Sequence, residues 1–229
     1  MELAKAYNQL LQRVQAACKR VGRNTSDIRL VAVSKTVGTD IIRQAYELGI
    51  RDFGENRAQD LRDKAGLLPG DINWHFIGHL QTNKIKYVAP KAVLIHSLDS
   101  WELACAISDY CKKHNLTVQA LMQVNTSGEV SKYGLPAEQA EEIFLRIYKE
   151  LPNIRLRGLM TMAPLTEDKS VIRQTFRKLK QLQEKLDSQV PTGNADILSM
   201  GMTHDFEIAI EEGSTMIRIG TALFGTRRR

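Results

Sequence analysis

The chain has 229 residues, of which 43% are hydrophobic and 25% are charged, so it is long enough to bury a large core. Its formal net charge of +6 favours anionic ligands but is too small to indicate a nucleic-acid-binding protein. The three cysteines show no CxxC spacing, which argues against a disulfide framework and against a zinc site.

The ends of the sequence do not resemble targeting segments. The first residues lack the basic and long apolar segments of a signal peptide, and no apolar stretch approaches the ~20 residues of a membrane-spanning helix. The last three residues, 227–229, are arginines, which we interpret as a solvated tail. We therefore expect one domain, residues 1–229, in the cytoplasm, with neither nucleic acid nor a membrane as partner.

The first predicted element is an amphipathic helix over residues 3–21, which Gly22 ends. Eight apolar, strand-like runs then alternate with helical patterns. The expected strands cover residues 30–34, 50–54, 74–78, 92–96, 118–124, 156–162, 197–202 and 216–220. The expected helices between them cover residues 40–48, 57–67, 83–88, 100–113, 136–151, 169–186 and 205–211.

Several helix starts carry capping signals. Thr39 or Asp40 is expected to cap the first helix that follows a strand, and Ser100 is expected to cap a later one. Pro136 stands at another helix start, where its missing N–H costs nothing because the first turn has no partner for it.

The alternation of strands and helices indicates the fold. Eight strands that alternate with helices are typical of parallel strands joined by right-handed crossovers. The strands are continuously apolar, as expected when both faces of a sheet are covered. We predict an α/β fold, a single closed (β/α)8 TIM barrel with an extra N-terminal helix. An open doubly wound sheet is the alternative.

Lys35 directly follows the first apolar strand, where a TIM barrel places its active site. If its amine is desolvated there, its pKa falls, and the neutral amine can attack a carbonyl to form a Schiff base. The alternative is a lysine that extends to water at a strand end. Other polar residues follow the remaining strands. They are Glu55, Asn56, His79, Asn125, Thr161, Ser199, Thr203 and Thr221.

The ends of the last two strands combine glycines with hydroxyl residues. These residues are Ser199, Gly201, Thr203, Gly220 and Thr221. Glycine lets backbone N–H groups approach a phosphate, and serine or threonine adds a short donor. Loops after strands seven and eight are the usual phosphate site of a TIM barrel. Tight packing of the strand ends is the alternative explanation.

Arg218 is predicted to point into the barrel. Side chains alternate between the two faces of a strand, so Arg218 points to the face opposite that of Ile217 and Ile219. The two isoleucines suit packing against the outer helices. Because the last strand of a closed barrel neighbours the first, Arg218 should lie near Lys35 and lower the pKa of its amine further. A buried arginine needs an acceptor, and a salt bridge to Glu55 is the structural alternative.

A reactive amine, a phosphate cradle and an arginine around one cavity indicate a phosphorylated aldehyde as ligand. Pyridoxal 5'-phosphate (PLP) meets all three demands, since it offers an aldehyde, a phosphate and a ring nitrogen. A Schiff-base aldolase acting on a sugar phosphate would use the amine and the cradle but would give Arg218 no ring to face.

At these residues the sequence resembles the pyridoxal phosphate homeostasis protein family, single-domain relatives of the alanine racemase N-terminal barrel. The resemblance covers essentially the whole chain, in order. The matching segments are residues 30–35 (LVAVSK), 53–56 (FGEN), 74–84 (WHFIGHLQTNK), 158–162 (GLMTM), 198–203 (LSMGMT) and 217–221 (IRIGT).

The resemblance implies fold-type III PLP binding with Lys35 as the Schiff-base lysine. Arg218 would face the pyridine nitrogen, and Asn56 would lie beside the ring or its 3-hydroxyl. His79 and Met160 would form the rim. The phosphate would be held around Ser199, Gly201, Thr203, Gly220 and Thr221. A serine is common in the family where Thr203 stands, and the hydroxyl is kept. The segment 131–134, which includes Lys132, also resembles the family, without an assigned role.

The function implied by the resemblance is PLP binding in intracellular vitamin B6 and amino-acid homeostasis, without conventional catalytic activity. Alanine racemases add a second base from a C-terminal β-domain, and we expect no such domain here because the sequence ends at Arg229. The alternatives are a slow amino-acid racemase, with Tyr133 or His79 as substitute base, a sugar-phosphate barrel, and a regulatory interaction module. Candidate partners are apo PLP-enzymes or a regulatory protein, and a monomer is the default expectation.

Overall fold

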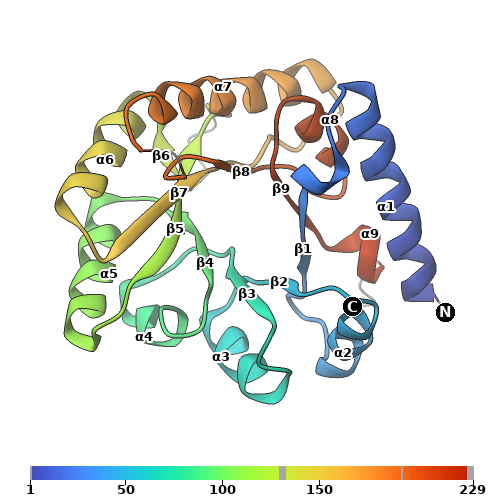
Figure 1. Cartoon of the computed structure of the whole chain (residues 1–229), viewed down its shortest axis with the longest axis horizontal. Helices are drawn as coiled ribbons and strands as arrows, with labels where there is room; N and C mark the ends of the chain where they lie inside the picture. Colours follow the sequence, from blue (N-terminus) through green and yellow to red (C-terminus); the bar gives the residue numbers. More distant parts are fainter. Residues whose placement is uncertain (1, 129–132, 192, 226–229) are drawn as a thin grey trace.

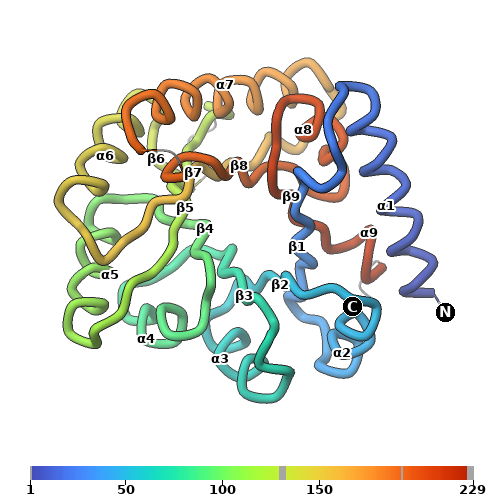
Figure 2. Tube along the Cα trace, in the orientation of Figure 1, coloured from blue at the N-terminus to red at the C-terminus, as the bar shows by residue number. Residues whose placement is uncertain are grey.

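The computed structural model describes residues 2–128, 133–191 and 193–225. Within them, parallel strands close into a barrel, which Figures 1 and 2 show as a ring of strands inside a ring of helices. The barrel strands are β1 (Arg29–Val33), β2 (Asp52–Glu55), β3 (Asn73–Phe76), β4 (Leu94–Leu98), β5 (Val118–Asn125), β7 (Ile154–Met160), β8 (Ile197–Ser199) and β9 (Met216–Ile219).

Two pairings decide between a barrel and an open sheet. Strand β9 pairs with β1 in parallel, and β4 pairs with β5, so no strand of the ring is left as an edge. The predicted (β/α)8 barrel is therefore confirmed, and the open doubly wound sheet is wrong. An unexpected two-residue strand, β6 (Leu135–Pro136), lies outside the ring against the end of β5.

The helices follow the strands in the predicted order. They are α1 (Glu2–Arg20), α2 (Thr39–Glu47), α3 (Ala58–Leu67), α4 (Ile85–Val88), α5 (Trp101–His114), α6 (Ala137–Glu150), α7 (Lys169–Asp187), α8 (Phe206–Glu211) and α9 (Thr221–Phe224), with 3-10 turns η1 (Thr25–Asp27) and η2 (Thr82–Lys84). The extra helix α1 packs outside the ring against α8 and α9 (Figure 1). The short helix α9 was not expected. No helix in the described part of the chain is long and apolar enough to cross a membrane.

Capping only partly follows the sequence signals. The Ser100 side chain accepts a hydrogen bond from the backbone N–H of Leu103 at 3.1 Å and so caps α5 as predicted. The expected cap of α2 by Thr39 or Asp40 is wrong, because the helix already begins at Thr39 and its N-cap is Gly38. Pro136 stands at the N-cap of α6, at the predicted helix start.

Strand alternation divides the apolar core into two layers. Inward-facing residues fill the barrel itself, and a larger outer layer packs between the strands and the helices. The inner layer consists of Val31, Leu94, Leu121, Met160 and Met216, with Met162 and Ile197 against it. The barrel interior is only partly apolar, because His75, His96, Ser199 and Arg218 are buried there as well.

Candidate functional site

A cavity of about 630 Å³ opens at the carboxyl ends of the strands. Its lining residues come from the ends of six strands of the barrel and the loops after them, and from the segment after β5. They are Val33, Lys35, Asn56, Ile77, Gly78, His79, Tyr133, Met162, Met202, Thr203, His204, Arg218, Gly220 and Thr221. Seven of the ten predicted site residues therefore lie around one space, as the sequence indicated.

Lys35 reaches this cavity because of the turn that follows β1. Ser34 points to the outer side of the barrel wall, where its hydroxyl donates to the Glu55 carboxylate at 2.6 Å. Thr36 adopts a left-handed backbone conformation with φ of 64°, and the N–H of Val37 bonds back to the carbonyl of Ser34. Lys35, between them, is half-buried in the cavity wall.

Glu55 has a different partner from the one considered. It is fully buried, and Lys64 of α3 donates to it at 2.7 Å. Burial raises the pKa of the Glu55 carboxyl, while the hydrogen bonds from Lys64 and Ser34 act in the opposite direction. The alternative of a Glu55–Arg218 salt bridge is wrong because Glu55 leaves β2 on the outer face, whereas Arg218 leaves β9 on the inner one.

Arg218 points inward, as predicted, and is 4% exposed. Its Nη1 donates to Ser199 Oγ at 2.6 Å and its Nη2 donates to the carbonyl of Thr161 at 2.9 Å. Burial lowers the pKa of this guanidinium to about 10, and the nearby charge of Asp205 acts against that shift. Arg218 therefore stays protonated at neutral pH, held from below by uncharged acceptors while it lines the cavity.

The hydroxyl and glycine residues divide into two groups. Thr203, Gly220 and Thr221 line the cavity, and Thr203 Oγ1 accepts from the N–H of Ala222 at 3.3 Å. Gly201 does not line the cavity. Its φ is +97°, and a Cβ there would come within 2.6 Å of Ala209 Cβ, so close packing against α8 explains this glycine.

The two remaining predicted residues lie one layer deeper. Met160 belongs to the inner apolar layer and is 1% exposed. Ser199 is fully buried, with its hydroxyl between Arg218 and His96. Met160 and Ser199 can therefore affect a ligand in the cavity only through the residues that lie between them and the cavity.

The remaining wall of the cavity comes from β2 and β3. Asn56 follows β2, and Gly78 approaches it so closely that a Cβ on Gly78 would lie 2.1 Å from the Asn56 carbonyl oxygen. His79 bonds to Asp99 at 3.0 Å and its ring stacks on that of Tyr133, with centroids 4.5 Å apart. Lys132, in the segment that resembles the family, lies outside the described residues.

Buried histidines were not among the predicted site residues. His75 and His96 are fully buried inside the barrel, and His96 bonds to Ser199 directly beneath Arg218. A usable signal was present, since strand alternation turns both residues inward, but no role was assigned to them from the sequence.

The comparisons with known proteins cover nearly the whole chain. The family model described as "Alanine racemase, N-terminal domain" matches residues 8–228. The chain is 44% identical to the pyridoxal phosphate homeostasis protein of Aquifex aeolicus (strain VF5), over the full length of both. This chain belongs to the pyridoxal phosphate homeostasis protein family. The protein of that name from Pseudomonas aeruginosa is 38% identical, over 98% of this chain and 96% of the relative.

Solved structures agree with this membership. PipY of Synechococcus elongatus PCC7942, described with PLP bound, is 32% identical with a TM-score of 0.83, over 97% of this chain and 100% of PipY. A protein from Bifidobacterium adolescentis, described as unknown, is 38% identical with a TM-score of 0.93, over 97% of this chain and 94% of that protein. Alanine racemase of Clostridium difficile 630 is 16% identical with a TM-score of 0.72, over 96% of this chain and 57% of the racemase, which shows a shared fold alone.

Proposed function

We propose that this protein binds pyridoxal 5'-phosphate, holds it through a Schiff base on Lys35, and serves intracellular vitamin B6 and amino-acid homeostasis. The observation that carries the proposal is one cavity lined by a lysine, a buried arginine bound to uncharged acceptors, and the threonine–glycine ends of the last strands. The relatives' names and the PLP described in PipY support the same cofactor.

The residues present fit the three chemical features of PLP. Thr203, Gly220 and Thr221 supply hydroxyl and backbone donors suited to a phosphate. Lys35 supplies the amine, and Asn56 supplies an amide for the ring or its 3-hydroxyl. The volume of about 630 Å³ lies within the range of pockets that enclose a small cofactor. His79 completes the rim. Met160, Ser199 and Gly201 support the site from below or from behind.

Arg218 determines which chemistry the site favours. When bound, PLP supplies an aldehyde that reacts with amines and a ring that can withdraw electrons. The guanidinium only donates hydrogen bonds and remains protonated at neutral pH, so it would hold the ring nitrogen of a bound PLP in the acceptor state. That state would weaken electron withdrawal, which would favour reversible storage of the cofactor over catalytic turnover.

The storage role carries two further parts. We propose release of the cofactor to apo PLP-enzymes, or control by a regulatory partner, because a reversible lysine attachment suits transfer. We also propose a cytoplasmic location, for which the support is the free thiols of Cys18, Cys105 and Cys111, as in a reducing compartment.

A second candidate, slow amino-acid racemisation, has one observation in its favour. Tyr133 and His79 line the same cavity as Lys35, and the His79 ring is held by Asp99 and by stacking on Tyr133. Two bases on one cavity are the arrangement that racemisation requires. Exchange of the Cα proton of free amino acids for deuterium, lost in Tyr133→Phe and in His79→Gln, would favour this candidate over storage.

The test of the proposed function is the absorption spectrum of the purified protein before and after borohydride, followed by peptide mass mapping. We expect a yellow band that reduction bleaches, with the added mass on Lys35. Lys35→Ala and Lys35→Arg should lose covalent attachment but keep some cofactor through the phosphate contacts, whereas the exposed-lysine control Lys91→Ala should match the wild type.

Two outcomes would contradict the proposal. Covalent cofactor in Lys35→Arg would remove Lys35 as the anchor. Absence of a chromophore after addition of PLP to the wild type would return Lys35 to an ordinary strand-end lysine and favour a sugar phosphate as ligand.

A further inference from the structure

A continuous chain of hydrogen bonds crosses the interior of the barrel. Asp52 Oδ1 lies 2.9 Å from His75 Nε2, and His75 Nδ1 lies 2.9 Å from His96 Nε2. His96 Nδ1 lies 2.9 Å from Ser199 Oγ, which accepts from Arg218 Nη1 at 2.6 Å. The five residues come from five different elements, so only the closed barrel brings them together.

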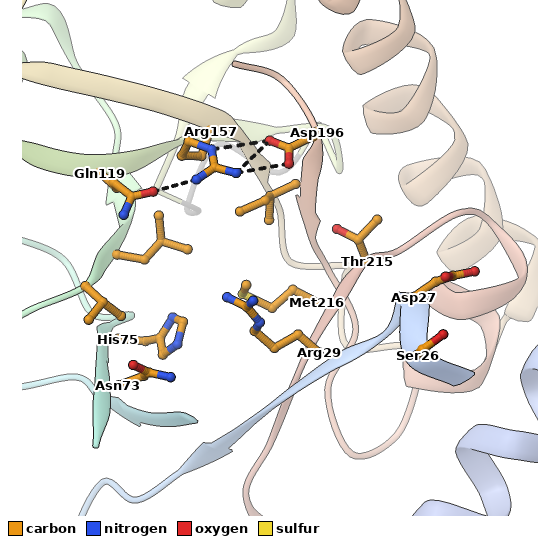
Figure 3. A pocket seen from close by; sticks show the side chains of 13 residues that line it. Ser26, Asp27, Arg29, Asn73, His75, Gln119, Arg157, Asp196, Thr215 and Met216 are labelled. Atoms are coloured by element: carbon orange, nitrogen blue, oxygen red, sulfur yellow. Dashed lines mark hydrogen bonds and ion pairs between the residues drawn. The ribbon is translucent and has the colours of Figure 1, made fainter. Parts of the chain in front are cut away.

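The two ends of this chain lie at opposite ends of the barrel. Arg218 lines the cavity at the carboxyl ends of the strands. His75 lines a second cavity, of about 610 Å³, at their amino ends, and Figure 3 shows it there with Arg29 directed into the same space. The Asp52 side chain is 19% exposed, whereas both histidines and Ser199 are fully buried.

The proton positions along these hydrogen bonds can be followed from the Arg218 end. The Arg218 guanidinium can only donate, so Ser199 Oγ accepts from it. Ser199 Oγ keeps a proton of its own, and His96 Nδ1, 2.9 Å away, is in position to accept it. In that arrangement His96 carries its proton on Nε2 and donates it to His75 Nδ1.

The lower end requires the same order. An ionised Asp52 can only accept, so His75 carries its proton on Nε2 and uses Nδ1 as an acceptor. Burial lowers the pKa of His75 and that of His96, which favours neutral rings with one proton each. The charged groups facing these rings are Asp52, which acts against the shift of His75, and Arg29 and Arg218, which add to the shifts of His75 and His96 respectively.

We propose that Asp52, His75, His96 and Ser199 are positioning residues that orient Arg218 from the opposite end of the barrel. The Asp52 carboxylate sets the direction of donation, the two histidines transmit it, and the Ser199 hydroxyl is thereby turned so that its lone pair faces the guanidinium. The proposal concerns residues of this protein alone. It rests on the proposed function only in the experiment that measures the affinity for PLP.

The first experiment measures the tautomers of His75 and His96 by ¹⁵N-edited NMR in the cofactor-free protein. We expect both rings to carry the proton on Nε2. A proton on Nδ1 of either ring in the wild type would overturn the proposal. This measurement needs no variant and no ligand, so it decides the proton order even if a substitution within the chain prevents folding.

The second experiment uses a matched pair of carboxylate variants. Asp52→Asn offers an amide that can donate as well as accept, so both histidines should become mixtures of tautomers. The dissociation constant for added PLP should rise by about three- to tenfold, the range expected for one perturbed hydrogen bond. Asp196→Asn, at the same end of the barrel but bonded to Arg157, should change neither tautomers nor affinity.

The outcomes separate this inference from the proposed function. Unchanged tautomers in a folded Asp52→Asn would contradict the positioning chain whatever the cofactor does. Wild-type protein that shows the expected tautomers but does not bind PLP would contradict the proposed function and leave the positioning of Arg218 supported.

Discussion

The two ends of the barrel carry cavities of nearly equal size, about 630 Å³ at the carboxyl ends of the strands and about 610 Å³ at the amino ends. They differ in how their charges are compensated. At the amino end, Arg157 bonds to Asp196 at 3.1 Å and to Gln119 at 2.6 Å (Figure 3). At the carboxyl end, Arg218 bonds to Ser199 Oγ and to the carbonyl of Thr161, and none of the described residues that line the cavity is a carboxylate.

This difference shows that cavity volume alone does not identify a ligand site. In the amino-end cavity, cations and carboxylates balance each other, so an anionic ligand would have to compete with Asp27 and Asp196. In the carboxyl-end cavity, the hydrogen bonds of the buried guanidinium within the described residues go to uncharged oxygens, and Asp205 is a nearby charge without a direct ion pair to it. Its positive charge can therefore attract an anion such as a phosphate-bearing cofactor.

The largest predicted effect comes from a substitution that disrupts the wall of the carboxyl-end cavity. Gly78→Ala places a Cβ 2.1 Å from the Asn56 carbonyl oxygen and within 2.8 Å of two further Asn56 backbone atoms. Because these neighbours are backbone, the loops must separate, and we expect a loss of about 3 kcal/mol or more in the free energy of unfolding. Urea denaturation measures it.

The control for this substitution is Gly66→Ala, in α3. A Cβ at Gly66 meets nothing within 4 Å, and alanine favours a helix, so we expect unchanged or slightly increased stability. Equal stability of Gly78→Ala and wild type would mean that the two loops are not held as closely as the structure has them.

A smaller effect tests whether the two cavities differ in phosphate binding. Thr221→Ala should weaken PLP binding by about 1 to 3 kcal/mol, the range for a charged partner that loses its hydrogen bond. Ser26→Ala, an exposed hydroxyl at the amino-end cavity, should leave the affinity unchanged. Spectroscopic titration with PLP compares them, and an unaltered affinity in Thr221→Ala would remove its hydroxyl from the phosphate site.

The smallest effect concerns the histidines that link the two cavities. Both have a lowered pKa in the folded protein, so their contribution to stability is complete above about pH 6.5, where the unfolded rings are also neutral. Below that pH the unfolded chain binds protons that the folded barrel does not. The free energy of unfolding should fall by up to about 1.4 kcal/mol per pH unit for each histidine.

Urea unfolding between pH 7.5 and 5.5 measures this dependence in wild type and in His96→Asn. The variant should show the shallower slope, whereas His114→Gln, on the exposed surface of α5, should keep the wild-type slope. The comparison of slopes is needed because Glu55, whose pKa is raised, acts in the opposite direction as the pH falls. Identical slopes in wild type and His96→Asn would show that this ring is already protonated in the folded state.

The sequence by itself determined the parts of this protein that depend on local patterns. Continuously apolar runs predicted the eight strands, because both faces of the sheet are covered, and a period of about 3.6 residues predicted the helices between them. The alternation of side chains along a single strand was enough to predict that Arg218 points inward and that its isoleucine neighbours point outward. The position of Lys35 followed from its place after the first strand, because all strands of a parallel barrel end at the same mouth.

Tertiary structure decided what depends on partners distant in sequence. The salt bridge of Glu55 with Lys64 and the close approach of Gly78 to Asn56 follow from how neighbouring elements meet in space. Ser199 and His96 are 103 residues apart, and their hydrogen bond exists only because the barrel closes. A hydrogen bond needs two atoms within about 3 Å, and no local pattern encodes that distance between separate strands.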